Sequence, residues 1–395
     1  MITNVVAPDK LGGLERYVRE LSAELVRQKH RVTVISKRTN DSQLATENFS
    51  DGVSVVRYDM PKKTDPFFAL KYPLATAFGV SRSLKKIKVQ SQDSVVLHGH
   101  FPLPMLTMAL LGTRYLYTCH APVYKEILDE RQASYALPKV LHQIVVKSFK
   151  RVERFVMKRA VTVITLSDFV AGEVVEIGAK KYDEVRRISG GLDTEWFTPG
   201  PRTALDGPEQ ERGGPRIFTA RRLVKRTGVE SLIRSMPGVL ELEPGATLEI
   251  AGDGSLKKQL EETVAELDLT NAVKFLGRIS EEELLECYRS ADIAVTPTRN
   301  LEGFGLATAE AMATGVVPLV TPVGANPELV SKLSPNLVTS GTEPEQLASG
   351  IVSLWRSPEL ASLRSRVRAA VHPEMGWPVV AEKYRRIYEA SRPSL

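Results

Sequence analysis

The sequence predicts an α/β protein made of two Rossmann-like domains, each a parallel sheet with helices on both faces. Short apolar segments alternate with helical patterns along most of the chain, which is the order of βαβ units. Near the middle, a stretch rich in glycine and proline (190–215) interrupts this alternation. The length of 395 residues also exceeds what one hydrophobic core usually supports.

The first domain opens on a βαβ unit. Apolar residues 2–6 predict a strand, the glycine loop 8–13 follows it, and Tyr17, Leu21 and Leu25 form one face of a helix. The later strands are predicted at 31–36, 94–97, 115–118 and 162–166. Because helical stretches separate these strands, we expect a parallel sheet.

The second domain repeats this alternation more regularly after the linker at 190–215. Its strands are predicted at 216–220, 247–252, 273–276, 293–297 and 317–320, and its helices at 228–240, 256–267, 281–290 and 305–313. A last helix is predicted at 377–390. The expected organisation is therefore a first domain over 1–195, a second over 196–375, and a C-terminal helix over 376–395 that packs back toward the first.

The composition, with 43% apolar and 25% charged residues, is ordinary for a globular protein. The longest apolar run, 103–112, is too short to span a membrane, and residues 1–30 lack the order of a signal peptide, so we expect a cytoplasmic protein. The two cysteines, Cys119 and Cys287, fit a reducing compartment and exclude a cysteine-based zinc cluster.

Positive charge is concentrated in the first half of the chain. Residues 1–195 hold 30 Lys and Arg against 21 Asp and Glu, whereas the remainder holds 23 against 26. Much of the excess lies in 62–88, where aromatic residues are interleaved, and in 139–159, a basic amphipathic pattern. The second stretch is compatible with a helix on an anionic membrane surface, but it favours an ordinary solvated helix face, because basic amphipathic helices are common.

The chemistry-bearing motif of the second domain is a glycine-rich turn between Glu302 and Glu310. Gly303 and Gly305 permit close backbone approach, and the free amides at the start of the following helix suit a phosphate oxygen. Glu302 is expected to accept hydrogen bonds from sugar hydroxyls, and Glu310 from ribose hydroxyls. Both glutamates are equally explained as acids on a helix surface, so the pair alone is a weak signal.

The segment from Glu302 to Val330, EGFGLATAEAMATGVVPLVTPVGANPELV, resembles the donor-site signature of glycosyltransferase family 4. Other segments are similar to that family in the same order: GGLERYVRELSAEL, GGLDTEWFTP, RRLVKRTGVESLI, AGDGSLKKQL and VKFLGRISEEELLECYRSADIAVTPT. The resemblance covers nearly the whole chain. It implies the GT-B architecture, in which two Rossmann-like domains face each other across a cleft.

The resemblance also assigns roles to single residues. Arg222 matches the arginine that grips the donor diphosphate, and Thr227 occupies the place where most relatives have a lysine. Arg226 is the residue that we expect to supply the missing charge. The donor is further expected to contact Gly12 and Gly13 in the first domain, and Gly303, Phe304, Gly305, Leu306 and Glu310 in the second.

His120 matches the histidine that faces the transferred sugar in relatives. It follows a predicted strand, as do His98 and His100, for which a structural role is equally expected. The catalytic residues predicted from the sequence are therefore His120, Arg222 and Glu302.

The resemblance implies a retaining transfer of a hexose-type sugar from a nucleotide-diphosphate sugar, with UDP or GDP as the nucleotide. No Asp-x-Asp motif is present, so neither a metal nor another cofactor is expected. The acceptor would be a lipid-linked molecule, a glycan or a small natural product, with possible peripheral membrane contact and no nucleic acid partner. The alternatives are a glycoside hydrolase, a dehydrogenase or nucleotide-binding module, and an inactive carbohydrate-binding homologue.

Overall fold

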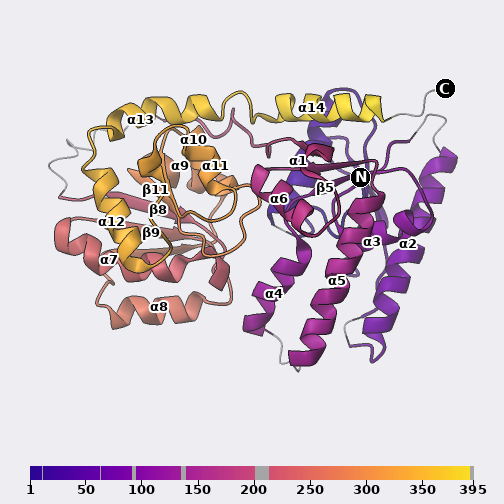
Figure 1. The fold of residues 1–395 in the computed structure, drawn as a ribbon, viewed down its shortest axis with the longest axis horizontal. Helices are drawn as coiled ribbons and strands as arrows, with labels where there is room; N and C mark the ends of the chain where they lie inside the picture. Colours follow the sequence, from indigo (N-terminus) through magenta and orange to yellow (C-terminus); the bar gives the residue numbers. More distant parts are fainter. Residues whose placement is uncertain (11, 63, 91–94, 135–138, 201–212, 392–395) are drawn as a thin grey trace. The chain divides into compact units, whose positions relative to one another are not determined.

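A computed structural model describes residues 1–10, 12–62, 64–90, 95–134, 139–200 and 213–391. The chain forms two compact units, both of which are α/β (Figure 1). Unit 1 comprises Met1–Lys125, Leu137–Gly191 and Trp377–Leu395, and unit 2 comprises Glu126–Ala136 and Leu192–Gly376. Part of the predicted linker, 201–212, lies outside the described residues.

The sheet of unit 1 is assembled from two groups of strands joined by Ile2, which pairs in parallel with Ile35 and with Gly99. The strand order is therefore β2, β3, β1, the Ile2 segment, β4, β5, β6, β7, and only the β2–β3 pair is antiparallel among the named pairs. These strands are β1 Thr33–Lys37, β2 Thr46–Asn48, β3 Ser54–Tyr58, β4 His98–Gly99, β5 Leu116–Cys119, β6 Thr162–Thr165 and β7 Val185–Arg187. The order reverses between Ile2 and β4, which makes this the topological switch point of the unit.

The helices of unit 1 bury apolar faces against this sheet. Its helices are α1 Gly13–Arg27, α2 Phe68–Gln90, α3 Pro102–Leu110, α5 Lys139–Arg159, α6 Asp168–Glu176 and α14 Trp377–Ala390, and α4 Val123–Ser134 begins in it. Helix α3 packs against both α2 and α5. Helix α14 packs against α1, where the Tyr17 hydroxyl donates to the Tyr384 hydroxyl at 2.9 Å.

Unit 2 contains a five-stranded parallel sheet in the order β10, β9, β8, β11, β12. The strands are β8 Arg216–Ala220, β9 Thr247–Ala251, β10 Val273–Gly277, β11 Ile293–Thr296 and β12 Val317–Val320. Every residue of β11 and β12 is buried, as expected of strands covered on both faces. The order reverses between β8 and β11, so their carboxyl ends form the switch point of this unit.

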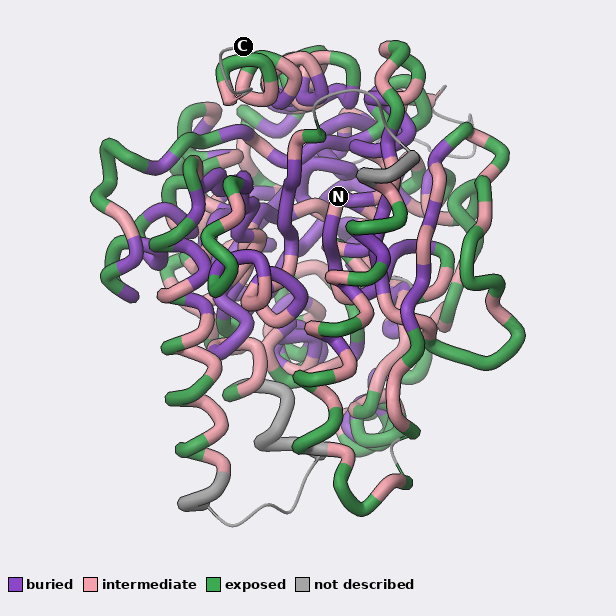
Figure 2. Tube along the Cα trace, turned by 90° about the vertical axis from the view of Figure 1, so that its right-hand side faces the viewer, coloured by how far each residue is buried: buried purple, intermediate pink, exposed green. Residues whose placement is uncertain are grey.

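Among the described residues of unit 2, four helices connect successive strands of this sheet, and three more follow the last strand. They are α7 Val229–Leu242, α8 Lys257–Glu266, α9 Glu281–Ser290, α10 Leu306–Ala313, α11 Asn326–Val330, α12 Pro344–Trp355 and α13 Leu360–Val367. Short 3₁₀ turns in unit 2 cover Lys225–Thr227, Pro335–Leu337 and Arg368–Ala370, and one in unit 1 covers Tyr182–Glu184. Buried residues follow the central strands, and exposed residues follow the outer turns of the helices (Figure 2).

The structure corrects two of the predicted strands of the first sheet and adds β2, β3 and β7, which the sequence did not predict. The strand expected at 94–97 pairs later, at His98–Gly99, and residue 94 lies outside the described residues. The expected strand 2–6 is reduced to the single bridging residue Ile2. None of the described helices combines the length and the apolar character that a membrane span requires.

Candidate active site at two sheet edges

The carboxyl edge of the unit 2 sheet brings the predicted donor residues together. Arg221 directly follows β8, and the loop containing Glu302 follows β11, the strand next to β8. In open α/β sheets, ligands bind outside the carboxyl ends of the strands at the switch point. The glycine-rich turn and the consecutive arginines Arg221 and Arg222 therefore lie where the topology predicts a ligand site.

The backbone of the Glu302 loop (301–306) is tightly specified. Leu301 has a φ of 48°, an unusual value for a residue with a side chain, and Gly305 has a φ of 89°. A Cβ atom on Gly305 would lie 2.4 Å from Asn326 Oδ1, so only glycine fits there. Gly305 is the N-cap of α10, which places Gly303 and Phe304 just before the helix and Leu306 at its first position.

Glu302 forms an ion pair with Arg221, with 2.7 Å between Oε2 and Nη2. The two side chains are 15% and 9% exposed, so solvent screens this pair only weakly. Burial acts to raise the pKa of Glu302, but the charge and hydrogen bond of Arg221, the charge of Arg226 and the amide of Gly305 hold it below its ordinary value. Glu302 is therefore an ionised carboxylate that is already engaged by protein groups.

A chain of hydrogen bonds between buried hydroxyl and amide groups connects this ion pair to the neighbouring elements. Arg221 Nη2 also donates to Thr298 Oγ1 at 3.0 Å, and Asn326 Nδ2 donates to the same oxygen at 3.3 Å. The Thr308 hydroxyl in turn donates to Asn326 Oδ1 at 3.0 Å. The network ties the ends of β8 and β11 to α10 and α11, so the position of Glu302 depends on all four elements.

The turn after β8 carries the other two predicted donor-site cations, Arg222 and Arg226. Arg226 Nη1 donates to the Leu301 carbonyl at 3.2 Å, which holds the guanidinium beside the Glu302 loop. Thr227 is buried, and its hydroxyl lies 2.7 Å from the carbonyl oxygens of both Arg222 and Val224. The Arg222 side chain is exposed. At the predicted lysine position, this chain therefore has a hydroxyl that closes the turn, with an arginine beside it directed at the loop.

Glu310 lies on α10 and is 5% exposed. Its Oε2 atom accepts a hydrogen bond from the Tyr288 hydroxyl at 3.3 Å. Tyr288 is itself 1% exposed and also reaches the Ala307 carbonyl at 3.1 Å. Glu310 is thus a buried carboxylate that a buried tyrosine hydroxyl contacts.

The carboxyl edge of unit 1 begins with the predicted glycine loop. Helix α1 starts at Gly13 with Gly12 as its extended N-cap. A Cβ atom on Gly12 would lie 2.3 Å from Glu15 Oε2, so this glycine makes room for the folded-back carboxylate. A Cβ atom on Gly13 would meet nothing within 4 Å among the described atoms. The side of the loop at Gly13 is therefore the open one.

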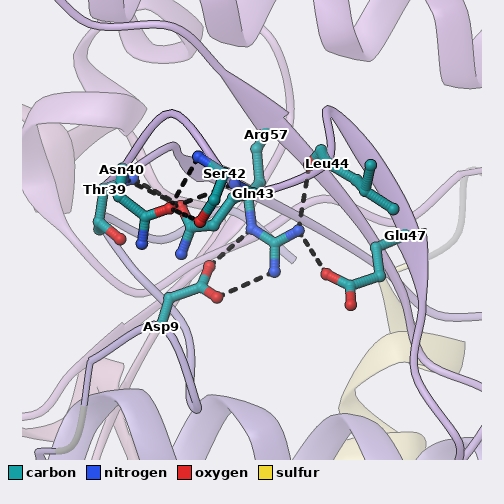
Figure 3. A network of polar contacts seen from close by, with 8 residues as sticks. All are labelled: Asp9, Thr39, Asn40, Ser42, Gln43, Leu44, Glu47 and Arg57. Atoms are coloured by element: carbon teal, nitrogen blue, oxygen red, sulfur yellow. Dashed lines mark hydrogen bonds and ion pairs between the residues drawn. The ribbon is translucent and has the colours of Figure 1, made fainter.

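A network of polar contacts around Arg57 holds this loop in place (Figure 3). Arg57, at the end of β3, donates Nε to Asp9 Oδ2 at 2.6 Å and Nη2 to Asp9 Oδ1 at 3.0 Å. Its Nη1 donates to Glu47 Oε2 at 2.7 Å and to the Leu44 carbonyl at 3.2 Å. The Arg57 side chain is 1% exposed. This fork fixes the segment that leads into Gly12 and Gly13.

Three histidines cluster at the ends of β4 and β5. A hydrogen bond of 3.1 Å joins His100 Nδ1 to His120 Nε2, and the Tyr17 ring meets the His120 ring edge-on with centroids 4.8 Å apart. Burial lowers the pKa of His120 from 6.5 to about 3. Burial and the neighbouring histidines also lower the pKa of His100 well below 6.5. Both imidazoles are therefore neutral near pH 7.

His98 has the structural role that one reading of the sequence gives it. Its Nε2 atom lies 2.7 Å from Thr118 Oγ1, and its Nδ1 atom lies 2.8 Å from the Tyr388 hydroxyl of α14. The loop after His120 is held separately, because the Glu153 carboxylate accepts the amides of Val123 and Tyr124 at 2.8 and 3.0 Å.

The structure brings Glu302, Arg226 and the α10 start together in unit 2, and His120 with His100 in unit 1. Sequence reasoning missed Arg221 and Arg57. Arg221 stands directly after a predicted strand, and this position indicates a place at the carboxyl edge of the sheet. The sequence does not indicate whether Arg221 or Arg222 is the arginine that turns inward. Arg57 lies in a short segment that was not predicted as a strand.

Comparison with known proteins identifies the class. A sucrose-phosphate synthase from Thermosynechococcus elongatus has the same fold, with a TM-score of 0.76, 21% identity and 98% of both chains covered. The Anabaena protein HepE, solved with UDP-glucose, matches with a TM-score of 0.72, 18% identity, 98% of this chain and 99% of its own. Two Rossmann-like units with these neighbours define a GT-B glycosyltransferase architecture.

Family models name the family more closely. The model described as Glycosyltransferase Family 4 matches residues 11–196, and the model described as Glycosyl transferases group 1 matches residues 204–370. A glycogen synthase of Mycobacterium tuberculosis is 26% identical over 99% of this chain and 94% of its own length. A D-inositol 3-phosphate glycosyltransferase of Corynebacterium jeikeium is 25% identical over 97% and 93%. The chain belongs to glycosyltransferase family 4.

Proposed function

We propose that this protein is a retaining glycosyltransferase that moves a hexose-type sugar from a UDP or GDP sugar to a hydroxyl group of its acceptor. The observation that carries the proposal is the ionised Glu302, held by Arg221 at the start of α10 on the switch-point edge of unit 2. Such an edge combines helix amides, cations and a fixed acceptor of hydrogen bonds, which suits a nucleotide diphosphate joined to a sugar.

The cations of this edge would have separate tasks. Arg221 is the positioning residue, because its Nη2 atom donates to both Glu302 and Thr298. Arg222 and Arg226 would contact the diphosphate and stabilise the charge that develops when the bond between the sugar and the phosphate oxygen breaks. The acceptor oxygen would form the new bond on the same face of the sugar, and its proton would pass to the departing phosphate.

The histidine edge of unit 1 would hold uncharged groups of the substrates. His100 Nε2 is buried, and no described residue bonds it. A buried N–H without an acceptor is rarer than a lone pair without a donor, so we infer that His100 donates from Nδ1 and His120 accepts at Nε2. His120 then carries its own hydrogen on Nδ1, as a neutral donor suited to a sugar hydroxyl.

The same carboxylates argue against the hydrolase alternative. A glycoside hydrolase needs a carboxylic acid with a raised pKa beside a second carboxylate. The pKa of Glu302 is lowered instead, mainly because Arg221 opposes the effect of burial, and Glu310 contacts Tyr288. Glu302 is thus unsuited to protonating a leaving group.

The donor is best tested by a thermal-shift screen of UDP, GDP, ADP and dTDP sugars. At a hundredfold excess over its dissociation constant, the true donor should stabilise the protein by about 2.7 kcal/mol. Release of the nucleotide in the presence of sugar and lipid acceptors would then measure turnover, and the anomeric configuration of the product would test retention. Stabilisation by every nucleotide sugar without turnover would favour the inactive homologue.

A further inference from the structure

Helix α2 of unit 1 exposes an apolar face that its own fold leaves uncovered. Phe67, Leu70, Leu74 and Phe78, which we call the apolar stripe, are 62%, 68%, 64% and 69% exposed. Leu70, Leu74 and Phe78 follow one another at a spacing of four residues and so lie on one side of α2, and Phe67 stands in the turn just before the helix. The opposite side carries Thr76, Val80 and Leu84, which are buried. Single exposed apolar residues are ordinary, whereas a continuous row of this kind indicates a contact surface.

Basic side chains surround the stripe. Lys62, Lys71, Arg82, Lys85 and Lys86 are exposed, and Asp65 is the single acid in the sequence between residues 62 and 88. Lys85 follows Phe78 by seven residues, so it continues the stripe along the same side of the helix. Apolar residues that end in a cluster of bases complement a bilayer surface with anionic headgroups. A second copy of the chain would instead bring basic groups against basic groups.

The first turns of α2 lie at the same sheet edge as the glycine loop. The Tyr72 hydroxyl donates to Asn4 Oδ1 at 3.3 Å and accepts from Lys37 Nζ at 3.0 Å. Asn4 follows the Ile2 segment, and Lys37 ends β1, so both residues mark the carboxyl edge of the sheet. The stripe therefore starts beside the edge that carries Gly13, on the helix α2 that lies next to α3 (Figure 1).

Helix α5, whose basic pattern is compatible with a membrane contact or with an ordinary solvated face, lacks this property. Its residues Val146, Phe149, Val152 and Phe155 pack against the core of unit 1. Most of the apolar side of α5 is thus used within the fold, with Ile144 left 54% exposed, and Lys147, Arg151 and Arg154 lie on its exposed side. The α2 surface differs because the four residues of the apolar stripe remain 62–69% exposed.

We propose that the apolar stripe and its flanking bases dock unit 1 onto a bilayer that contains anionic lipids, with the stripe inserted at the headgroup boundary. The inference deepens the proposed function, on which it rests in one respect: docking beside the glycine-loop edge would suit a lipid-linked acceptor. Binding to the bilayer itself needs neither donor nor turnover.

The test is flotation of the full chain with vesicles of phosphatidylcholine, alone or mixed with phosphatidylglycerol. The wild-type protein should float with the mixed vesicles at low salt and detach as salt rises. The variant Leu70→Ser/Leu74→Ser/Phe78→Ser and the variant Lys85→Glu/Lys86→Glu should each bind at least roughly tenfold more weakly. The matched control, Lys147→Gln/Lys150→Gln/Arg151→Gln/Arg154→Gln on α5, should keep most of the binding.

Several outcomes would overturn the proposal. They are no binding by the wild-type protein, equal losses in the α2 and α5 variants, or full binding by the stripe variant. Sedimentation that shows a dimer dissociated by the stripe substitutions would assign the surface to a second copy. Thermal shift with nucleotide sugars and no vesicles tests the donor site separately, so failure of docking and failure of the proposed function are distinguishable.

Discussion

The two sheet edges of this protein both lie at a switch point, but the polar groups predicted to meet the ligand are charged at one edge and neutral at the other. Both are carboxyl edges of parallel sheets at a switch point, and both present the start of a helix after a glycine turn. At the edge of unit 2, Arg221, Arg226 and the ionised Glu302 are the principal groups. At the edge of unit 1, His100 and His120 are neutral and Tyr17 adds an aromatic ring.

This difference shows how one fold serves two ligand chemistries. A diphosphate carries negative charge, which increases on the leaving group during transfer, so fixed cations are useful where it binds. Hydroxyl groups of a sugar or an acceptor are neutral, and neutral donors and acceptors match them without the cost of burying a charge. The comparison therefore supports donor recognition by unit 2 and recognition of uncharged groups by unit 1.

The largest expected effect is on the charged edge. Glu302→Ala leaves Arg221 without its carboxylate in a site where the side chain is 9% exposed. Breaking a buried ion pair in this way typically costs about 3–5 kcal/mol, so the free energy of unfolding should fall by that order. Urea denaturation followed by circular dichroism measures the loss.

Arg222→Ala is the matched control for that experiment. Arg222 is exposed, and a surface charge in contact with other groups typically contributes at most about 1 kcal/mol, so its removal should lower the free energy of unfolding by no more than that. Turnover should nevertheless fall, because we assign Arg222 to the diphosphate. Equal stability of Glu302→Ala and wild type, or equal destabilisation by both substitutions, would contradict the division of tasks between the two arginines.

The neutral edge predicts a pH dependence of its own. In the unfolded chain His120 binds a proton near pH 6.5, whereas in the folded state its pKa is about 3. Its contribution to stability is therefore complete above pH 6.5 and is lost as the pH falls toward 3. The slope in that window is about 1.4 kcal/mol per pH unit for each such histidine. Denaturation of the wild type and of His120→Gln between pH 7 and pH 5 should show a smaller slope in the variant.

Nuclear magnetic resonance gives a direct check on the same residue. The ring carbon signals of His120 should stay those of a neutral imidazole between pH 8 and pH 5. Measurements below pH 5 are not needed for this test. Titration of His120 with a midpoint near 6.5 would remove the contrast between the two edges.

The sequence predicts the regular parts of this architecture because buried parallel strands are apolar throughout. Strands β11 and β12 and the turn with Glu302 and Gly305 follow from composition and spacing alone. The short strands β2 and β3 do not, because their few residues include polar ones. The pairing of His100 with His120 also escapes a linear reading, since it depends on β4 lying beside β5.

The smallest expected effect concerns Thr227, which stands where relatives usually have a lysine. Thr227→Lys removes a hydroxyl that bonds two carbonyl oxygens, but each of these carbonyls also accepts a backbone amide, from Val224 and from Thr227 itself. The free energy of unfolding should fall by about 1 kcal/mol. Turnover should stay within a few-fold of wild type, because Arg226 already directs its charge at the Glu302 loop.

The decisive comparison combines this substitution with Arg226→Ala. Arg226→Ala alone should lower turnover by roughly one to two orders of magnitude, as loss of a charge-assisted contact predicts. Adding Thr227→Lys to it should restore part of that loss, since a lysine stem can extend from the same turn toward the diphosphate. Nucleotide release under saturating donor measures both changes. The idea would be wrong if Arg226→Ala left turnover unchanged and Thr227→Lys alone abolished it. The charge of Arg226 would then not compensate for the replaced lysine, and Arg222 would be the only cation that contacts the diphosphate.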